Sequence, residues 1–238
     1  MRVSDITRPL NDLLSLLFPR LCQACGNHLV KNEQVICTSC LLDMPLTGFH
    51  LERENALERS LWGRCYAEKA TAWSYYRRGG KMQHLIHRLK YAGIREVGLF
   101  LGRYYGTVLA DSGFMDGIDY LVPVPLHPTR ERKRGFNQAE VICTGISEST
   151  GVPLLTTAIV RTGRSDTQTR KSRVERWENV ENIFAPGPDP LPENAHLLVV
   201  DDVITTGSTI ESCVNLLRES GSVKVSVAAL AVAESGTS

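Results

Sequence analysis

The stretch from His196 to Thr209 constrains the fold of this chain more than any other. Residues 196–200 are mostly apolar and predict a buried strand, which runs directly into two adjacent acids, Asp201 and Asp202. A short loop follows, and then a helical stripe formed by Ile210, Val214 and Leu217. Ligands of open parallel sheets bind at the carboxyl ends of the strands, so we expect the functional site here.

The loop itself is built from hydroxyl residues and one glycine: Thr205, Thr206, Gly207, Ser208 and Thr209. Backbone N–H groups and hydroxyls at a helix N-terminus bind phosphate, and the helix dipole favours the anion. The chain contains no G-x-x-x-x-G-K-[ST] motif, which argues against a nucleoside triphosphatase. Because the two acids can accept hydrogen bonds from vicinal ribose hydroxyls, the segment suggests a ribose 5-phosphate. The alternative is a strand end followed by a Ser/Thr helix cap.

The rest of the chain alternates between strands and helices. Residues 120–124 and 223–232 predict strands, 135–149 predict a helix with Phe136 on its apolar stripe, and Met82 to Leu89 predict another helix. This alternation indicates an α/β fold with a mostly parallel sheet and helices on both faces. A first amphipathic helix is expected to end at Pro19. We expect two regions, an N-terminal helix and knuckle over 1–65 and the main domain over 66–238.

Four of the seven cysteines form two pairs, Cys22-x2-Cys25 and Cys37-x2-Cys40. Two thiolates at this spacing can bind one tetrahedral zinc ion, and Gly26 supplies the flexible backbone for the turn. The zinc would be structural, since four thiolates leave no open position for a substrate. The alternative is structural disulfides or unrelated core cysteines. Cys65, Cys143 and Cys213 are isolated and are expected to pack as small hydrophobic residues.

Composition narrows the class of protein. The 238 residues carry a net charge of +1, which excludes a wholesale polyanion binder on composition alone. The apolar run 13–18 is too short to span a bilayer, so we expect no membrane span. It also lacks a basic region and a small-residue cleavage site of the kind found in a signal peptide, and we therefore expect a cytoplasmic protein.

Several motifs together resemble a known family. The string Val-Asp-Asp-Val-Ile-Thr-Thr-Gly over 200–207 resembles the phosphoribosyl pyrophosphate motif of type I phosphoribosyltransferases. The segment 122–138, Leu89-Lys90-Tyr91, the run from Thr167 to Asn179 and the four-cysteine knuckle are similar to the ComF/GntX family of competence-associated, phosphoribosyltransferase-like proteins. The resemblance covers nearly the whole chain and implies the type I phosphoribosyltransferase-like fold.

The resemblance also implies roles for individual residues. Asp201 and Asp202 match the acidic pair that holds the ribose hydroxyls, and residues 205–209 match the loop that holds the 5-phosphate. Four basic residues of the pyrophosphate-binding region would neutralise the leaving group: Arg130, Arg132, Lys133 and Arg134. The stretch 161–179 corresponds to a loop that closes over the site in such enzymes.

The implied reaction transfers phosphoribosyl from phosphoribosyl pyrophosphate to a nitrogen acceptor, with Mg²⁺ bridging pyrophosphate and ribose oxygens. Purine-salvage members of the superfamily carry a third acid in the loop, where this chain has Thr205. Orotate phosphoribosyltransferases also lack that acid, so turnover is not excluded. The sequence leaves the acceptor unidentified.

A second hypothesis is a non-catalytic protein of DNA uptake or utilisation, with phosphoribosyl pyrophosphate as a regulatory ligand. From Arg77 to Arg95 there are six basic residues and no acid, and a basic groove with aromatic side chains suits single-stranded DNA. The aromatic residues nearby are Trp73, Tyr75, Tyr76 and Tyr91. They have an alternative role in packing the core, and the charges an alternative role as a solvated face or in binding phosphate. Other DNA-uptake proteins are the partners that the family implies.

Overall fold

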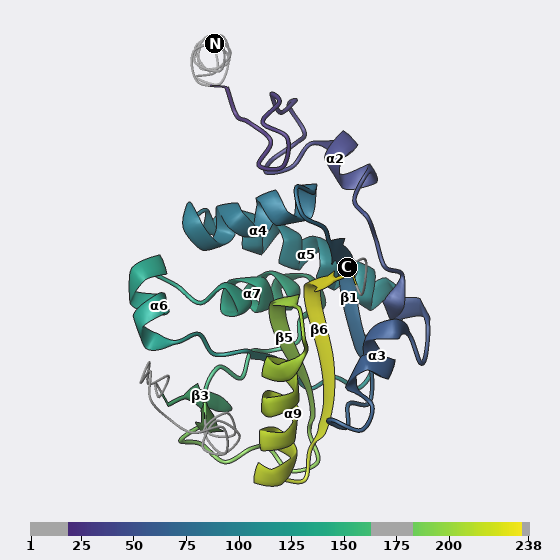
Figure 1. Cartoon of the computed structure of the whole chain (residues 1–238), viewed down its shortest axis with the longest axis vertical. Coiled ribbons are helices and arrows are strands. Elements are labelled where there is room, and N and C mark those ends of the chain that lie inside the picture. Colours follow the sequence, from purple (N-terminus) through teal and green to yellow (C-terminus); the bar gives the residue numbers. More distant parts are fainter. Residues whose placement is uncertain (1–18, 163–182, 235–238) are drawn as a thin grey trace, which may run out of the picture.

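The computed structural model describes residues 19–162 and 183–234. Its main sheet has the order β1 (Ala70–Tyr76), β6 (Lys224–Ala233), β5 (His196–Ile204) and β2 (Tyr120–Pro123) (Figure 1). Every neighbouring pair is parallel, with Leu198 opposite Ser226 and Val122 opposite Val199. This confirms the predicted α/β fold with a parallel sheet. The helix expected before Pro19 lies outside the described residues.

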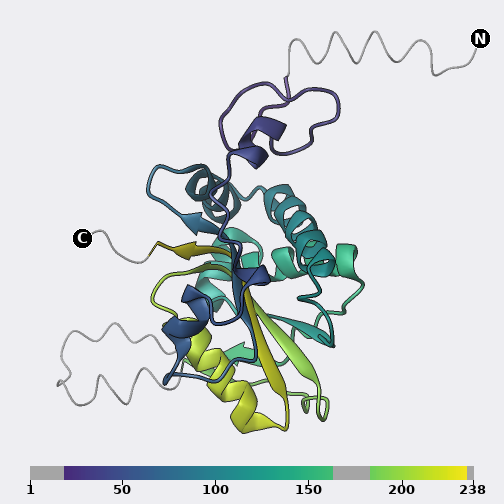
Figure 2. The ribbon, with the colours of Figure 1, turned by 90° about the vertical axis from the view of Figure 1, so that its right-hand side faces the viewer.

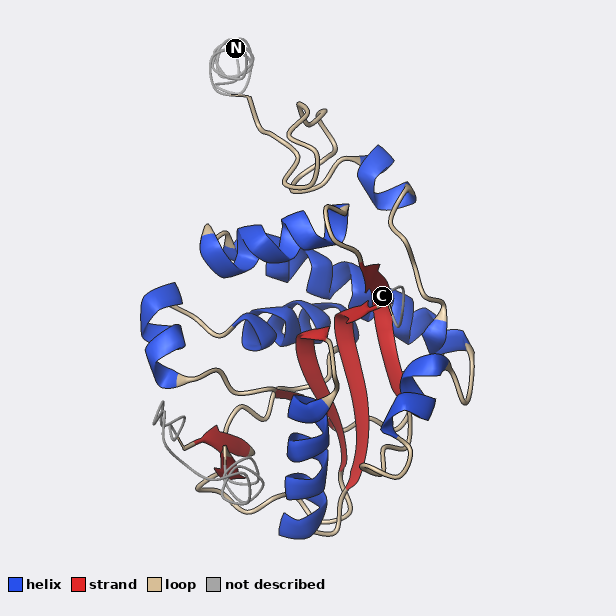
Figure 3. Cartoon of the chain, in the orientation of Figure 1, coloured by secondary structure: helices blue, strands red, loops and turns tan. Residues whose placement is uncertain are grey.

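Helices cover both faces of the sheet, as predicted (Figure 3). On one face lie α4 (Lys81–Tyr91), α5 (Arg95–Asp111) and α7 (Gln138–Thr150), whose apolar side chains share one core cluster with Leu198 and Val200. The opposite face is covered by α9 (Ser208–Ser220) and α3 (Ala56–Leu61), which share the other cluster with Leu197 and Val199. The alternation of side chains along β5 therefore supplies both cores.

Smaller elements surround this layer. An antiparallel pair, β3 (Ile159–Arg161) and β4 (Phe184–Pro186), stands apart from the main sheet, and α6 (Pro128–Arg134) follows β2. The N-terminal part holds α2 (Thr38–Leu42) and a 3₁₀ turn, η1 (Phe49–Leu51). No helix of residues 19–162 and 183–234 combines the length and apolar character needed to cross a bilayer.

The predicted helix over 135–149 begins too early. Gly135 ends α6 with a φ of 82°, and α7 begins after Asn137, whose side chain accepts a hydrogen bond from the Ala139 N–H at 3.0 Å. Phe136 lies in the link between the two helices and is buried there. A glycine that ends one helix and an asparagine that caps the next therefore lie within three residues of each other, and they separate α6 from α7 although the apolar stripe continues through Phe136.

Two elements have no clear signal in the sequence. Strand β1 contains two buried polar residues, Thr71 and Ser74. The Thr71 hydroxyl accepts a hydrogen bond from the Tyr105 hydroxyl, and the Ser74 hydroxyl donates one to the Pro45 carbonyl. Helix α5 carries glycines at four-residue intervals, which lower helix propensity. At Gly102 a Cβ would lie 2.3 Å from the Ile142 carbonyl of α7, so the close approach of the two helices requires glycine there.

The four paired cysteines come together in the knuckle, defined here as residues 20–44. Their sulfur atoms lie within 4.8 Å of one another, and the sulfurs of Cys25 and Cys37 are 3.8 Å apart. Tetrahedral zinc at about 2.3 Å from each sulfur places two sulfurs roughly 3.8 Å apart, so the cluster fits the ion. The backbone N–H of Cys37 also donates to the Cys22 sulfur at 3.3 Å.

The knuckle packs on the helical face of the domain (Figure 2). Cys22, Cys40 and Met44 are buried in the same core cluster as Met82 and Leu85 of α4. His84 of α4 lies 3.2 Å from the Ala24 carbonyl through its Nδ1, and Lys81 pairs with Asp43. A metal bound by the four thiolates would therefore stabilise the packing of the knuckle against α4.

We expect purified protein to carry one zinc ion per chain and the Cys22→Ser variant to carry almost none, since a three-thiolate site loses most of its affinity. Metal analysis and thermal unfolding measure this. The variant should unfold at a lower temperature, because its knuckle is buried against α4.

Cys65→Ser is the matched control, because Cys65 lies outside the four-cysteine cluster. It should keep the full zinc content. A zinc-free wild-type protein of unchanged stability after chelation would show that the cluster has another role.

Candidate functional site

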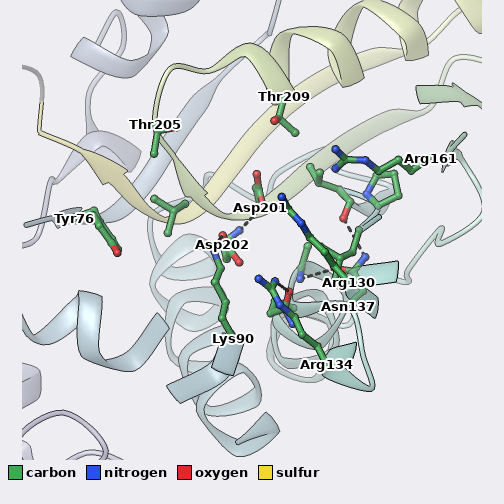
Figure 4. A pocket seen from close by; sticks show the side chains of 16 residues that line it. Tyr76, Lys90, Arg130, Arg134, Asn137, Arg161, Asp201, Asp202, Thr205 and Thr209 are labelled. Carbon is green, nitrogen blue, oxygen red and sulfur yellow. Dashed lines mark hydrogen bonds and ion pairs between the residues drawn. The ribbon is translucent and has the colours of Figure 1, made fainter. Parts of the chain in front are cut away.

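A pocket of about 350 Å³ opens at the carboxyl ends of three parallel strands (Figure 4). Tyr76 ends β1, Val124 follows β2, and Asp201 and Asp202 lie near the end of β5. Its volume suits a small-molecule ligand. The charged residues of its lining are Lys90, Arg130, Arg134, Arg161, Asp201 and Asp202.

The two acids diverge although they are adjacent in sequence. Asp202 is buried and accepts an ion-paired hydrogen bond from Lys90 Nζ of α4 at 2.7 Å. Asp201 points toward the side of the pocket where Thr209 lies (Figure 4) and accepts a hydrogen bond from the Asp202 backbone N–H at 2.7 Å. Strand alternation explains the divergence, because successive side chains leave opposite faces. One carboxylate is thus paired and the other faces the cavity.

The pKa of Asp201 is raised to about 7. Burial is the main cause and the negative charge of Asp202 adds to it, while the Asp202 N–H bond, Lys90 and Arg161 act in the opposite direction. A carboxyl group that lines a pocket and has a pKa near 7 is typical of a ligand-binding or catalytic position.

Three arginines face these acids across the pocket. Arg130 and Arg134 lie one helical turn apart on α6, and Arg161 ends β3. Arg134 donates to the Gln138 Oε1 at 2.6 Å, and none of the three forms an ion pair with any residue that the structure describes. With Lys90 they give four cations against two carboxylates, an arrangement suited to an anion.

Arg161 carries the clearest sign of an unmet interaction. Burial and the positive charge of Arg130 lower its pKa. Its Nε is buried and has no hydrogen-bond partner among residues 19–162 and 183–234. Its guanidinium lies 5.3 Å from the centre of the Phe184 ring, which supports it from the side. An anion bound between Arg130 and Arg161 would offset the repulsion between the two guanidinium groups and would accept a hydrogen bond from the Arg161 Nε.

The predicted basic cluster is split by helix geometry. Arg130 and Arg134 line the pocket, whereas Lys133 lines a neighbouring cavity and Arg132 lines neither. His127 caps α6, its Nδ1 accepting the Thr129 N–H at 3.2 Å. Arg130 and Arg134 are four positions apart on α6, and this helical spacing determines which of the four predicted residues share a site.

The predicted phosphate loop lies at the same edge. Thr205 and Thr209 line the pocket, while Thr206 and Ser208 are exposed, with their hydroxyl oxygens 3.1 Å apart. Gly207 begins α9 with a φ of 78°, and no side chain caps the helix. Glycine, not Ser or Thr, therefore occupies the cap position itself, and the Ser208 N–H donates a long hydrogen bond, 3.5 Å, to the Thr206 Oγ1.

Lys90, Asn137 and Tyr76 are lining residues that the sequence does not place in this pocket. Lys90 follows the apolar stripe of α4, and only the fold brings it to Asp202. Asn137 caps α7 and donates from its Nδ2 to the Val124 carbonyl at 3.0 Å, which joins α7 to the end of β2. Tyr76 lines the pocket from β1. The Asn137 cap is a signal that the sequence does contain.

The predicted closing loop runs from 161 to 179, and its residues beyond 162 lie outside the described part of the chain. The fit of a magnesium ion can be judged from the carboxylates alone. Mg²⁺ binds through one or two carboxylates together with substrate phosphates. Asp201 and Asp202 offer such oxygens beside an anion pocket, so the donor set fits this ion.

The raised pKa of Asp201 predicts a pH-dependent stability. The folded protein binds the Asp201 proton more tightly than the unfolded chain does, so this group stabilises the fold below about pH 4. That contribution is lost as the pH rises to about 7. Asp201→Asn removes the effect, and the variant should gain stability relative to wild type across this range, by at most about 4 kcal/mol.

Urea unfolding at several pH values measures the free energy of unfolding of the variant and of wild type. Titration of the cysteines contributes equally to both proteins, so it cancels in the difference. Asp116→Asn, which changes an exposed acid far from the pocket, is the control and should follow wild type. An Asp201→Asn difference that did not change between pH 4 and 7 would contradict this account of the pocket.

Known proteins are similar to this chain over most of its length. Residues 129–238 match the model of the phosphoribosyl transferase domain. DNA utilization protein YhgH of Escherichia coli is 29% identical over 212 residues, covering 87% of this chain and 88% of that protein. Competence protein F of Haemophilus influenzae is 36% identical over 47% of this chain and 49% of its own length. Competence protein ComFC of Bacillus subtilis is 26% identical over 87% of this chain and 82% of its own. These relatives and this domain match support a ComF-family protein with a type I phosphoribosyltransferase-like domain.

Proposed function

We propose that the pocket binds phosphoribosyl pyrophosphate with Mg²⁺ and that the protein transfers the phosphoribosyl group to a nitrogen acceptor. The observation that carries the proposal is the arrangement of Arg130, Arg134 and Arg161 around Asp201 at the carboxyl ends of the strands. Cations that form no ion pair with any described residue, lying beside a carboxylate, suit a ligand that combines phosphates with hydroxyl groups.

We propose one orientation for the ligand. The 5-phosphate lies against the loop 205–209, where the helix start of α9 offers free N–H groups and hydroxyls. The ribose hydroxyls donate to the carboxylates of Asp201 and Asp202. The pyrophosphate then lies toward Arg130, Arg134 and Arg161, whose charges match a leaving group of several negative charges.

The reaction then proceeds by loss of the leaving group. The C1–O bond breaks, pyrophosphate leaves with the electron pair, and positive charge develops on the ribose. The three arginines stabilise the departing charge and the acids hold the sugar in place. Mg²⁺, when bound, neutralises pyrophosphate oxygens. The acceptor nitrogen attacks C1 from the opposite face and afterwards releases its proton.

The acceptor is the open part of the proposal. The loop has Thr205 where purine-salvage enzymes carry an acid, so it supplies no carboxylate to take the acceptor proton. Of the described lining residues, Asp201 carries a carboxyl whose pKa of about 7 suits proton exchange in the pocket. We place the protein in nucleotide metabolism linked to DNA use, in the cytoplasm, with other DNA-uptake proteins as partners.

The double variant Asp201→Asn/Asp202→Asn tests the placement of the ligand. It should bind phosphoribosyl pyrophosphate at least about 10-fold more weakly, because it loses charge-assisted bonds to two hydroxyls. Inorganic pyrophosphate, titrated without Mg²⁺, should bind as well as to wild type or better, since two negative charges have gone. Calorimetry measures both ligands.

Pyrophosphate release in the same samples tests transfer, with a panel of nitrogenous bases as acceptors. Glu140→Gln, an exposed acid on α7, serves as the control and should match wild type. If the double variant bound phosphoribosyl pyrophosphate as tightly as wild type does, the ribose would lie elsewhere. Binding without release for every base would favour the regulatory alternative.

That alternative, a phosphoribosyl pyrophosphate-responsive protein that binds single-stranded DNA, is favoured by a second cavity. It has a volume of about 500 Å³ and adjoins the first, sharing Lys90, Arg130 and Arg134 with it. Tyr91 on its wall is 70% exposed, and the Arg134 guanidinium lies 5.5 Å from the ring centre. Trp73, in contrast, is buried against Tyr104 and Tyr105 and packs the core.

For this alternative, Tyr91→Ala should weaken binding of a thymidine oligonucleotide by about 10-fold, as expected for the loss of one stacking ring. Fluorescence anisotropy measures the affinity. Tyr66→Ala is a matched control, because Tyr66 is also exposed and lies beneath an arginine, Arg218 at 4.6 Å. Equal losses in both variants, or none in either, would argue against this cavity as a DNA site.

A further inference from the structure

We propose that Arg64 is a positioning residue for the phosphate loop, and that it acts by neutralising Glu211 and fixing the Thr206 carbonyl. The inference rests on the proposed function, since it concerns how the same pocket holds a 5-phosphate. Arg64 lies 141 residues before the first residue of this loop, three positions after the end of α3, and only the fold brings the two together.

Arg64 forms bonds to the loop and to the helix that follows it. Its Nη1 donates to the Thr206 carbonyl at 2.8 Å, and its Nε and Nη2 donate to the Glu211 Oε2 at 3.0 and 2.6 Å. Glu211 lies in the first turn of α9, and its backbone N–H bonds to the Gly207 carbonyl at 2.9 Å. One guanidinium therefore links the last turn of the loop to the start of the helix.

The arginine is itself held in place. Asn215, one turn further along α9, donates from its Nδ2 to the Arg64 carbonyl at 3.2 Å. The Arg64 N–H bonds to the Leu61 carbonyl at 3.0 Å, which continues the end of α3. A Cβ at Gly207 would lie 3.4 Å from the Arg64 Nη1, so the guanidinium packs closely beneath the residue that starts α9.

Charge explains why the loop needs this residue. Glu211 is a negative group at the helix start that would receive a phosphate dianion. An unpaired carboxylate there would oppose the phosphate, whereas the two bonds from Arg64 offset its charge. The bond to the Thr206 carbonyl also orients the peptide that precedes Gly207, so the following N–H groups face the ligand without rearrangement. Glu211 and Arg64 are absent from the pocket lining, so they act through the loop.

The experiment compares three probes: phosphoribosyl pyrophosphate with Mg²⁺, ribose 5-phosphate, and inorganic pyrophosphate. Arg64→Ala should bind the first two about 10-fold more weakly or worse, because both present a 5-phosphate. Inorganic pyrophosphate binds at the arginines and should change by less than about twofold. Arg64→Lys keeps the charge and loses the fork, and it should fall between Arg64→Ala and wild type.

Glu211→Gln separates the two effects. Added to Arg64→Ala, it should restore part of the lost affinity for ribose 5-phosphate, because it removes the unpaired charge. Alone, it should leave that affinity unchanged or higher. Arg103→Ala is the matched control, since Arg103 pairs with Glu148 on the distant α5–α7 surface. Thermal unfolding identifies any variant that fails to fold, and Glu211→Gln then provides the test.

Each outcome decides something. Equal losses for all three probes in Arg64→Ala would make Arg64 a general support of the fold and would overturn the inference. If Arg64→Ala bound ribose 5-phosphate as tightly as wild type does, the inference would also be overturned. The proposed function would stand in that case, provided that the wild-type protein bound phosphoribosyl pyrophosphate. Wild-type protein that bound no sugar phosphate would overturn the proposed function and this inference together. Selective loss with partial restoration by Glu211→Gln would support it.

Discussion

A sheet with only parallel strands leaves the carboxyl ends of all its strands at one edge, and the chemistry of this chain depends on that constraint. Helices bury both faces, so this edge is where Tyr76, Val124 and Asp201 can meet from three separate strands. Two acids at the end of a buried strand would repel each other. Lys90 pairs with Asp202, and the raised pKa of Asp201 reflects the repulsion and burial that remain. The arginines of the pocket follow from the same requirement for opposite charge.

The sequence predicts what is encoded locally. The strand, acids, loop and helix around Asp201 are contiguous, and so are the two cysteine pairs, so their chemistry can be read before the fold is known. Lys90 and Asp202 are 112 residues apart, and no local pattern links them. The sequence does not predict helix α5 for a different reason. Its glycines disfavour an isolated helix, and the contact with α7 outweighs that preference. The choice of Arg130 and Arg134 over Lys133 likewise appears only once α6 has formed.

The N-terminal half of the chain completes the pocket. The phosphoribosyl transferase domain match begins at residue 129, yet Tyr76 and Lys90 line the pocket from before that point. Arg64 contacts the loop over 205–209 from further upstream still. The boundary at residue 65 remains a prediction, but a break there would pass beside a residue that contacts the loop. An N-terminal region of this kind therefore has two physical tasks, which are to support α4 through the knuckle and to set the charge at the start of α9.

The two candidate functions are not independent, because Lys90, Arg130 and Arg134 line both cavities. A pyrophosphate group and a nucleic-acid phosphate would both draw on these cations, and neither anion can occupy them without raising the free energy of binding the other. Such coupling is reciprocal: whatever factor the sugar phosphate imposes on DNA affinity, DNA imposes on the sugar phosphate. Loss of pyrophosphate during transfer would remove most of that negative charge and free the arginines. If both proposed functions hold, chemistry in the first cavity and occupancy of the second would be linked through these three shared side chains.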